Sequence, residues 1–113
     1  MTNIWIGVGR LARDPELRYG ESTKAVAAMR IAVARAGGGD DADFFDVACF
    51  GQLAEACATH LTKGRQVLVE GSLRQHTWTD AATSERRSRV EVVANRVQFL
   101  DGPRRSEDSP AAA

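Results

Sequence analysis

Apolar and polar positions alternate along most of this sequence with a period of two, which is typical of β-strands that bury one face. Five stretches show the alternation: residues 4–9, 25–35, 44–50, 67–74 and 90–99. Half-buried strands of this kind favour antiparallel β structure. In the first stretch Ile4 and Ile6 would face the core. Trp5 would then face outward, where it could stack on a base or lie under an oligomer contact.

One segment, residues 52–61, has helical spacing instead. Its apolar residues fall on one helical face: Leu53, Ala56, Cys57 and Leu61. The spacing predicts one short amphipathic helix, and Gly64 just beyond it is placed to end the helix as a C-cap. Turns are predicted between the elements at residues 14–15, 19–20, 37–41 and 80–84.

The predicted order of elements is three strands, a helix and two strands. The OB-fold, a small five-stranded Greek-key barrel, has this order. Another small barrel or a split α+β sandwich would share it, so the pattern alone leaves these alternatives open. The predicted class is all-β with one short helix, in a domain over residues 1–100. Residues 101–113 hold no large apolar side chain and are predicted to form a disordered tail.

Length and composition suit one globular domain: 113 residues, 43% hydrophobic and 27% charged. No apolar run is long enough to span a bilayer, and the N-terminus lacks the basic-then-apolar order of a signal peptide. We therefore expect a cytoplasmic protein that does not contact a membrane.

Charge by itself says little about a partner. The formal net charge is zero, from 15 basic and 15 acidic residues. All basic residues except Lys24 and Lys63 are arginine, whose planar guanidinium suits phosphates and bases. A GC-rich genome would produce the same excess of arginine, so this bias decides nothing.

Few residues could carry catalysis or hold a metal ion. His60 and His76 are the only histidines, and neither lies in a metal-ligand motif. No serine lies in a nucleophile elbow. A solvated hairpin loop explains the acidic cluster better than a cation site does; its residues are Asp40, Asp41, Asp43 and Asp46. We expect no enzyme, no metal and no cofactor.

The two cysteines, Cys49 and Cys57, are eight residues apart, a spacing that matches no zinc or redox signature. We interpret them as two small buried side chains, with a bridge between subunits of an oligomer as the alternative. A reducing cytoplasm disfavours a disulfide between them.

Aromatic side chains among arginines give the best indication of function. Phe44 and Phe50 lie on the same side of their predicted strand, and the opposite side already holds apolar residues for the core. Arg74, His76 and Trp78 share one face of the next strand. Flat rings stack on any nucleobase and neighbouring arginines neutralise phosphates, so the pattern favours binding of single-stranded nucleic acid.

Five blocks of sequence stand out: GRLARDPELRY at 9–19, FGQLAE at 50–55, KGRQV at 63–67, VEGSLR at 69–74 and WTD at 78–80. In this order they resemble the bacterial single-stranded DNA-binding protein family, and the resemblance covers about residues 3–99. It implies an OB-fold that binds single-stranded DNA without sequence preference, in DNA replication, recombination or repair. It also implies a homotetramer, with a dimer as the alternative, associated with the nucleoid.

The resemblance assigns base stacking to three aromatic residues and phosphate contacts to basic residues along the DNA path. The aromatic positions are Phe44, Phe50 and Trp78, and the basic positions are Arg74 and Lys63, with Arg10 and Arg13 flanking the matched first turn.

The chain departs from the family pattern at several positions. A tryptophan that many members have at the end of the second strand falls near Gly37, and Gln52 replaces the lysine at the helix entry. His76 and Thr77 stand at positions that are often basic. We expect other arginines to replace part of that charge, namely Arg30, Arg35 and Arg65. Fewer phosphate contacts predict that the affinity for DNA depends less steeply on salt. Each missing contact lowers the slope of log affinity against log salt by about 0.7 for single strands.

Residues 101–113 also lack the Gly/Pro-rich linker and the acidic, phenylalanine-tipped end of the main replication members. The resemblance thus implies a short paralogue that does not recruit repair or replication enzymes through such a tail. An alternative function is an OB-fold adaptor that packs its aromatic face against protein in a replication-restart type of assembly.

Overall fold

The computed structural model describes residues 1–21 and 23–100, and the predicted tail at 101–113 lies outside the described residues. The described chain forms six strands and one helix. In chain order they are β1 (Trp5–Leu11), β2 (Glu16–Tyr19), β3 (Ala25–Ala34), β4 (Ala42–Phe50), α1 (Gly51–His60), β5 (Gln66–Thr79) and β6 (Arg86–Phe99).

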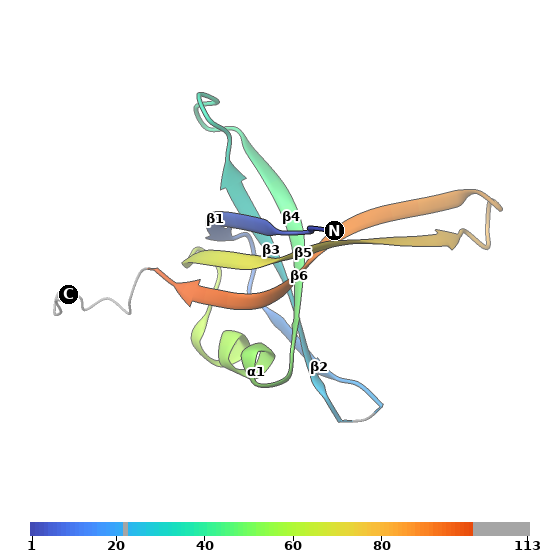
Figure 1. Ribbon diagram of the computed structural model, residues 1–113, viewed down its shortest axis with the longest axis horizontal. Helices are drawn as coiled ribbons and strands as arrows, with labels where there is room; N and C mark the ends of the chain where they lie inside the picture. The colour runs from blue at the N-terminus through green and yellow to red at the C-terminus, as the bar shows by residue number, and fades with distance from the viewer. Residues whose placement is uncertain (22, 101–113) are drawn as a thin grey trace, which may run out of the picture.

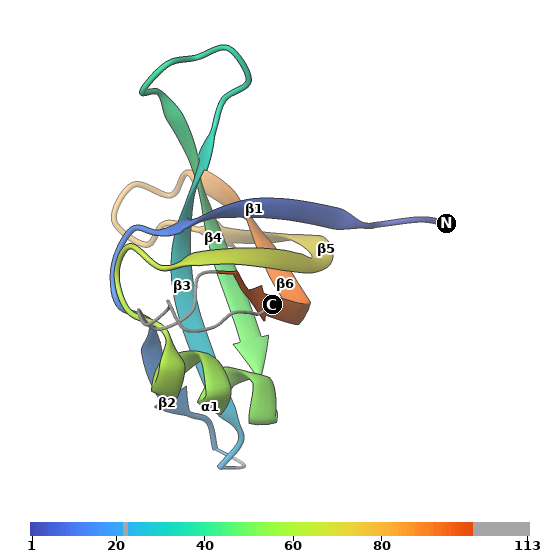
Figure 2. The same ribbon diagram turned by 90° about the vertical axis from the view of Figure 1, so that its left-hand side faces the viewer.

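Five of these strands close into a barrel. Neighbouring strands follow the order β1-β5-β6-β4-β3, and the end of β1 pairs with β3 through Leu11 and Ile31 to close the ring. The pairing of β4 with β6 is parallel, and the other pairings in the ring are antiparallel. The helix α1 lies across one end of the barrel (Figure 1; Figure 2). This strand order and helix position confirm the predicted OB-fold.

Small and medium apolar side chains fill the interior of the barrel. On β3 the buried residues alternate with partly exposed ones; they are Ala25, Ala27, Met29 and Ile31. The other ring strands, α1 and the residue after it supply further buried side chains: Leu11, Val47, Cys49, Ala54, Cys57, Leu61, Val67, Val69, Val92 and Ala94. Among the described residues no polar or charged residue is buried, so the interior of the barrel is entirely apolar.

The predicted orientation of β1 is wrong. Trp5 packs against the core, whereas Ile4 and Ile6 are 69% and 58% exposed. Gly7 explains the reversal, because a Cβ atom there would lie 2.3 Å from Cη2 of Trp5. The missing side chain leaves room for the indole on the inner face. Gly9 is buried against the β3 backbone on that same face. Two inward positions of β1 are therefore glycines, and the hydropathy pattern makes the face with Ile6 and Val8 the more apolar one.

The alternation does not predict β2, which lies outside the ring and pairs with β3. All four of its residues are exposed, so they carry no buried period. The turns predicted at 14–15 and 19–20 flank this strand. Those predicted at 37–41 and 80–84 are confirmed, since they join β3 to β4 and β5 to β6.

The helix ends at His60, and Gly64 is not its C-cap as predicted. Leu61 has an extended backbone, and its N–H donates to the carbonyl of Cys57. The side chain of Leu61 is buried, which turns the chain back toward the barrel before Gly64 is reached. Gly64 has a φ of +92° in the following turn, and its N–H donates to the carbonyl of Leu11 at 2.8 Å.

The strands β5 and β6 extend beyond the predicted limits and form a hairpin that projects from the barrel (Figure 1). β6 begins at Arg86 because the polar residues 86–89 pair with the end of β5. These residues have no core to face and therefore show no apolar period. In the described part of the chain, no helix has the length and apolar character needed to cross a membrane.

Candidate nucleic-acid interface

The outer side of β4 carries two exposed aromatic rings. Phe44 is 51% exposed and Phe50 is 39% exposed. Residues of the opposite parity point inward: Val47 is buried, and Phe45 packs against Trp5 with ring centroids 5.2 Å apart. The structure thus places Phe44 and Phe50 outward, as the alternation predicts, because the core occupies the other side of the strand. Trp5, in contrast, lies on the core side and is not part of this surface.

Each of these two rings has a cation beside it. The Cζ atom of Arg30 lies 5.2 Å from the centroid of Phe44, and Nζ of Lys24 lies 6.0 Å from that of Phe50. Arg30 also pairs with Asp46 on the neighbouring strand, with Nη1 2.9 Å from Oδ1. This ion pair holds the guanidinium near the ring and offsets part of its charge.

The projecting hairpin carries the third exposed ring. Trp78 is 45% exposed and shares its side of β5 with Arg74 and His76, as predicted. The register places Arg89 of β6 opposite His76. An open cleft of about 340 Å³ is lined by His76, Trp78 and Arg89. An aromatic ring beside two nitrogen-bearing side chains suits the stacking of a base and contact with its phosphate.

Arg89 was not among the residues predicted from the sequence. Its signal is the basic run at 86–89, which holds three arginines. Alternation could not place it, because only the β5–β6 register brings it beside His76. The neighbouring Arg87 is paired with Asp80 at 3.1 Å and with Glu85 at 3.6 Å, so its charge is balanced within the hairpin.

The pairing of β4 with β6 joins the rings of β4 and the hairpin into one surface. Ala48 lies on the same side of β4 as the two phenylalanines and pairs with Val93 of β6. Two residues earlier on β6, Glu91 contacts Nε2 of His76. The surface therefore runs from β4 across β6 to β5. We call it the aromatic face, and its residues are Arg30, Phe44, Phe50, Arg74, His76, Trp78 and Arg89.

A second group of basic residues lies where β1 meets the turn between α1 and β5. The group, which we call the basic turn, comprises Arg10, Arg13, Lys63 and Arg65. Arg10 donates to the carbonyl of Gly64 at 2.9 Å, and the backbone N–H of Lys63 donates to Asp14 at 2.8 Å. Arg10 pairs across strands with Ala32, which in turn pairs with a residue of the aromatic face. The two surfaces are thus contiguous around the barrel.

Arg35 lies where β3 enters its loop and is balanced by a carboxylate. Its guanidinium lies 2.9 Å from Oδ1 of Asp43. The hydrogen bond, and then the Coulomb attraction, raise the pKa of Arg35 above its ordinary value. Arg35 is therefore charged at all relevant pH values, but its charge is already balanced by Asp43 within the hairpin of β3 and β4.

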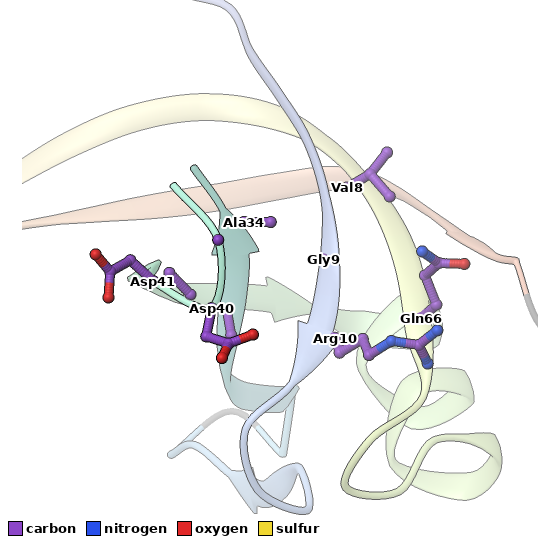
Figure 3. A pocket seen from close by; sticks show the side chains of 10 residues that line it. Val8, Gly9, Arg10, Ala34, Asp40, Asp41 and Gln66 are labelled. Carbon is purple, nitrogen blue, oxygen red and sulfur yellow. The ribbon is translucent and has the colours of Figure 1, made fainter. Parts of the chain in front are cut away.

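A pocket of about 240 Å³ lies between β1 and the β3–β4 loop. Figure 3 shows Arg10 and Gln66 on one side of it, and Asp40 and Asp41 on the other. The two carboxylates would repel a phosphate, whereas the guanidinium of Arg10 on the opposite side would attract one. Within residues 1–21 and 23–100, no three His, Cys, Asp or Glu side chains gather as a metal site. Asp40 and Asp41 lie in the exposed β3–β4 loop as predicted, whereas Asp43 and Asp46 lie on β4, where they pair with Arg35 and Arg30.

Comparison with known proteins matches residues 1–100 to the single-strand binding protein family. A single-stranded DNA-binding protein of Thermotoga maritima is 50% identical over 105 residues, which cover 88% of this chain and 74% of that protein. One from Treponema pallidum is 41% identical, covering 89% of this chain and 61% of that protein. One from Helicobacter pylori is 36% identical, covering 99% of this chain and 64% of that protein. The chain therefore belongs to the single-strand binding protein family, whose members bind DNA and are not enzymes.

Proposed function

We propose that this protein coats single-stranded DNA without sequence preference, as a homo-oligomer that protects the strand in replication, recombination or repair. The observation that carries the proposal is the aromatic face, on which three exposed rings lie among arginines on the outside of an OB barrel. The protein would act in the cytoplasm, in association with the nucleoid.

Stacking supplies the part of the affinity that does not depend on sequence. Phe44, Phe50 and Trp78 present ring surface to solvent, and every base has a flat face to place on it. Each stacked base contributes about 1–3 kcal/mol by alanine substitution. No buried polar pocket is needed to distinguish one base from another, in accord with binding that tolerates any sequence.

Phosphate contacts supply the salt-dependent part. Arg74, Arg89 and the basic turn are the candidates that line the path from the hairpin around the barrel. Arg30 and Arg35 already face Asp46 and Asp43, so we expect each to add less than one full contact. Binding that releases counterions at only a few phosphate contacts weakens moderately as the salt concentration rises. Each contact adds about 0.7 to the slope of log affinity against log salt.

An open edge and an apolar outer surface on β1 support self-association. β1 pairs with β5 along Trp5–Arg10 but with β3 only at Arg10 and Leu11, so no strand of residues 1–21 or 23–100 lies beside most of its other edge. Ile4, Ile6 and Val8 expose apolar surface along the same strand. Proteins usually cover such an edge, and a second copy of this chain would do so. The tetramer itself is proposed from the family resemblance.

The test is a titration of fluorescein-labelled oligo-dT followed by anisotropy, which does not depend on the protein's own tryptophans. The triple variant Phe44→Ala, Phe50→Ala, Trp78→Ala should bind at least about a hundredfold more weakly than the parent. Tyr19→Ala is the matched control, because Tyr19 is an exposed aromatic on β2 that contacts Glu55 of the helix instead.

Unchanged affinity in the triple variant would overturn the proposed site. Weak binding by the parent itself would overturn the function, and would favour the alternative of a protein adaptor that uses its aromatic face for assembly.

A further inference from the structure

The two cysteines of the chain meet inside the barrel. Cys49 comes from the end of β4 and Cys57 from α1, and their Sγ atoms are 4.0 Å apart. Both side chains are 0% exposed. A sulfur buried in the core cannot reach a second chain, so the bridge between subunits considered from the sequence is not compatible with this structure.

The pair makes a second link between β4 and α1, which are already joined at Phe50–Gly51, because Cys57 lies two turns further along the helix. Cys49 pairs in the sheet with Ala27 and points inward. Cys57 is on the buried side of α1, and its carbonyl accepts the N–H of Leu61 where the helix ends. A bond between the two sulfurs would fasten the covering helix to the barrel strand.

We propose that Cys49 and Cys57 are an oxidation site, at which hydrogen peroxide converts the two thiols into an intramolecular disulfide. A disulfide has an S–S length of about 2.05 Å, so the sulfurs must approach by about 2 Å. This approach would require rotation of both side chains and a small shift of the ten-residue helix. In a reducing compartment the pair remains two thiols.

The reaction takes place in two displacements. One cysteine thiolate attacks an oxygen of the peroxide; the S–O bond forms, the O–O bond breaks, and hydroxide leaves as water with the proton of that thiol. The second sulfur then attacks the sulfenic sulfur; the S–S bond forms, the S–O bond breaks, and a second water leaves with the second proton. Two electrons pass from the sulfurs to one peroxide.

The test uses the full chain, treated with excess peroxide in native buffer until the reaction is complete, then denatured, alkylated and digested with trypsin. Residues 36–63 contain no lysine or arginine before Lys63, so one peptide carries both cysteines. The proposal predicts that this peptide loses the mass of two hydrogen atoms, resists alkylation and recovers both thiols after reduction. The chain should remain a monomer on a denaturing, non-reducing gel.

Alkylated thiols, sulfinic or sulfonic acids, or a covalent dimer as the main product would each overturn the proposal. Thermal unfolding gives a second measurement. Oxidation should raise the midpoint of the parent by at least about 4 °C, reversibly, by fastening α1 to β4. The matched variants Cys49→Ala and Cys57→Ala should show no such rise. A midpoint of the oxidised parent that is unchanged or lower would contradict the fastening of the helix.

Discussion

The aromatic face combines two regions that hold their rings in different ways. On β4, Phe44 and Phe50 stand on a strand whose other side is packed into the barrel, and each has a cation beside it. On the hairpin that projects from the barrel (Figure 1), Trp78 pairs with Arg87 across the strands and is not among the described residues that pack against the core. A ring that is already fixed loses less conformational entropy when a base stacks on it. We therefore expect the β4 region to contribute more of the binding free energy than the hairpin.

The largest effect is expected from the double variant Phe44→Ala, Phe50→Ala. Loss of two stacked bases costs about 2–6 kcal/mol, which is a decrease in affinity of at least about 30-fold. Both rings are exposed, so the thermal midpoint should change little. Anisotropy titration with oligo-dT measures the affinity, and Tyr19→Ala is the control. If Trp78→Ala alone weakened binding more than this double variant, the ranking of the two regions would be wrong.

Trp78→Ala should have the next largest effect. We expect binding about tenfold weaker, since one stacked base is lost from the less restrained region. Since Trp78 is not among the described residues that pack against the core, the midpoint of thermal unfolding should stay that of the parent. A clear fall in that midpoint would instead show that the ring of Trp78 is packed as part of the cooperative core.

Arg89→Ala tests the hairpin through charge instead of stacking. Arg89 lines the cleft with His76 and Trp78, so its removal should weaken binding about fivefold at low salt and lower the slope of log affinity against log salt by about 0.7. Titrations at four or more salt concentrations give the slope. Arg87→Ala is the comparison variant: Arg87 already pairs with Asp80, so its removal should lower the slope by less than the removal of Arg89 does.

Asp46→Asn should have the smallest effect, and in the opposite direction. Removing the carboxylate leaves Arg30 beside Phe44 with its full charge, so binding should strengthen by about twofold and the salt slope should steepen by up to about 0.7. The same salt series measures it. Weaker binding in this variant would mean that Asp46 acts mainly by holding Arg30 in place, and that neutralising the charge of Arg30 is its lesser effect.

The sequence predicts the regions where alternation and burial agree. β4 has apolar residues at the inward positions along its packed part, Phe45, Val47 and Cys49, so both its core side and its exposed phenylalanines follow from the pattern. The order of elements then leads to the OB barrel, and the blocks that resemble the family cover the same residues.

The remaining features depend on contacts between distant residues. On β1, the inward position of Trp5 depends on the absence of a side chain at Gly7, which a hydropathy pattern reads as a weak position. On the hairpin, Arg89 joins the site only through its register with His76. The contact between Cys49 and Cys57 likewise requires the helix to be placed on the barrel. Period and spacing along the chain carry no information about such pairings.

The most direct test of the proposed interface uses the chain's two tryptophans, because only one of them lies on the aromatic face. Trp5 packs against the core, whereas Trp78 stands exposed on the aromatic face. Fluorescence titration with oligo-dT would be made on Trp5→Phe, which keeps only Trp78, and on Trp78→Phe, which keeps only Trp5. We predict strong, saturable and salt-sensitive quenching in the first variant and little change in the second. Quenching confined to the variant that keeps Trp5 would contradict the interface proposed here.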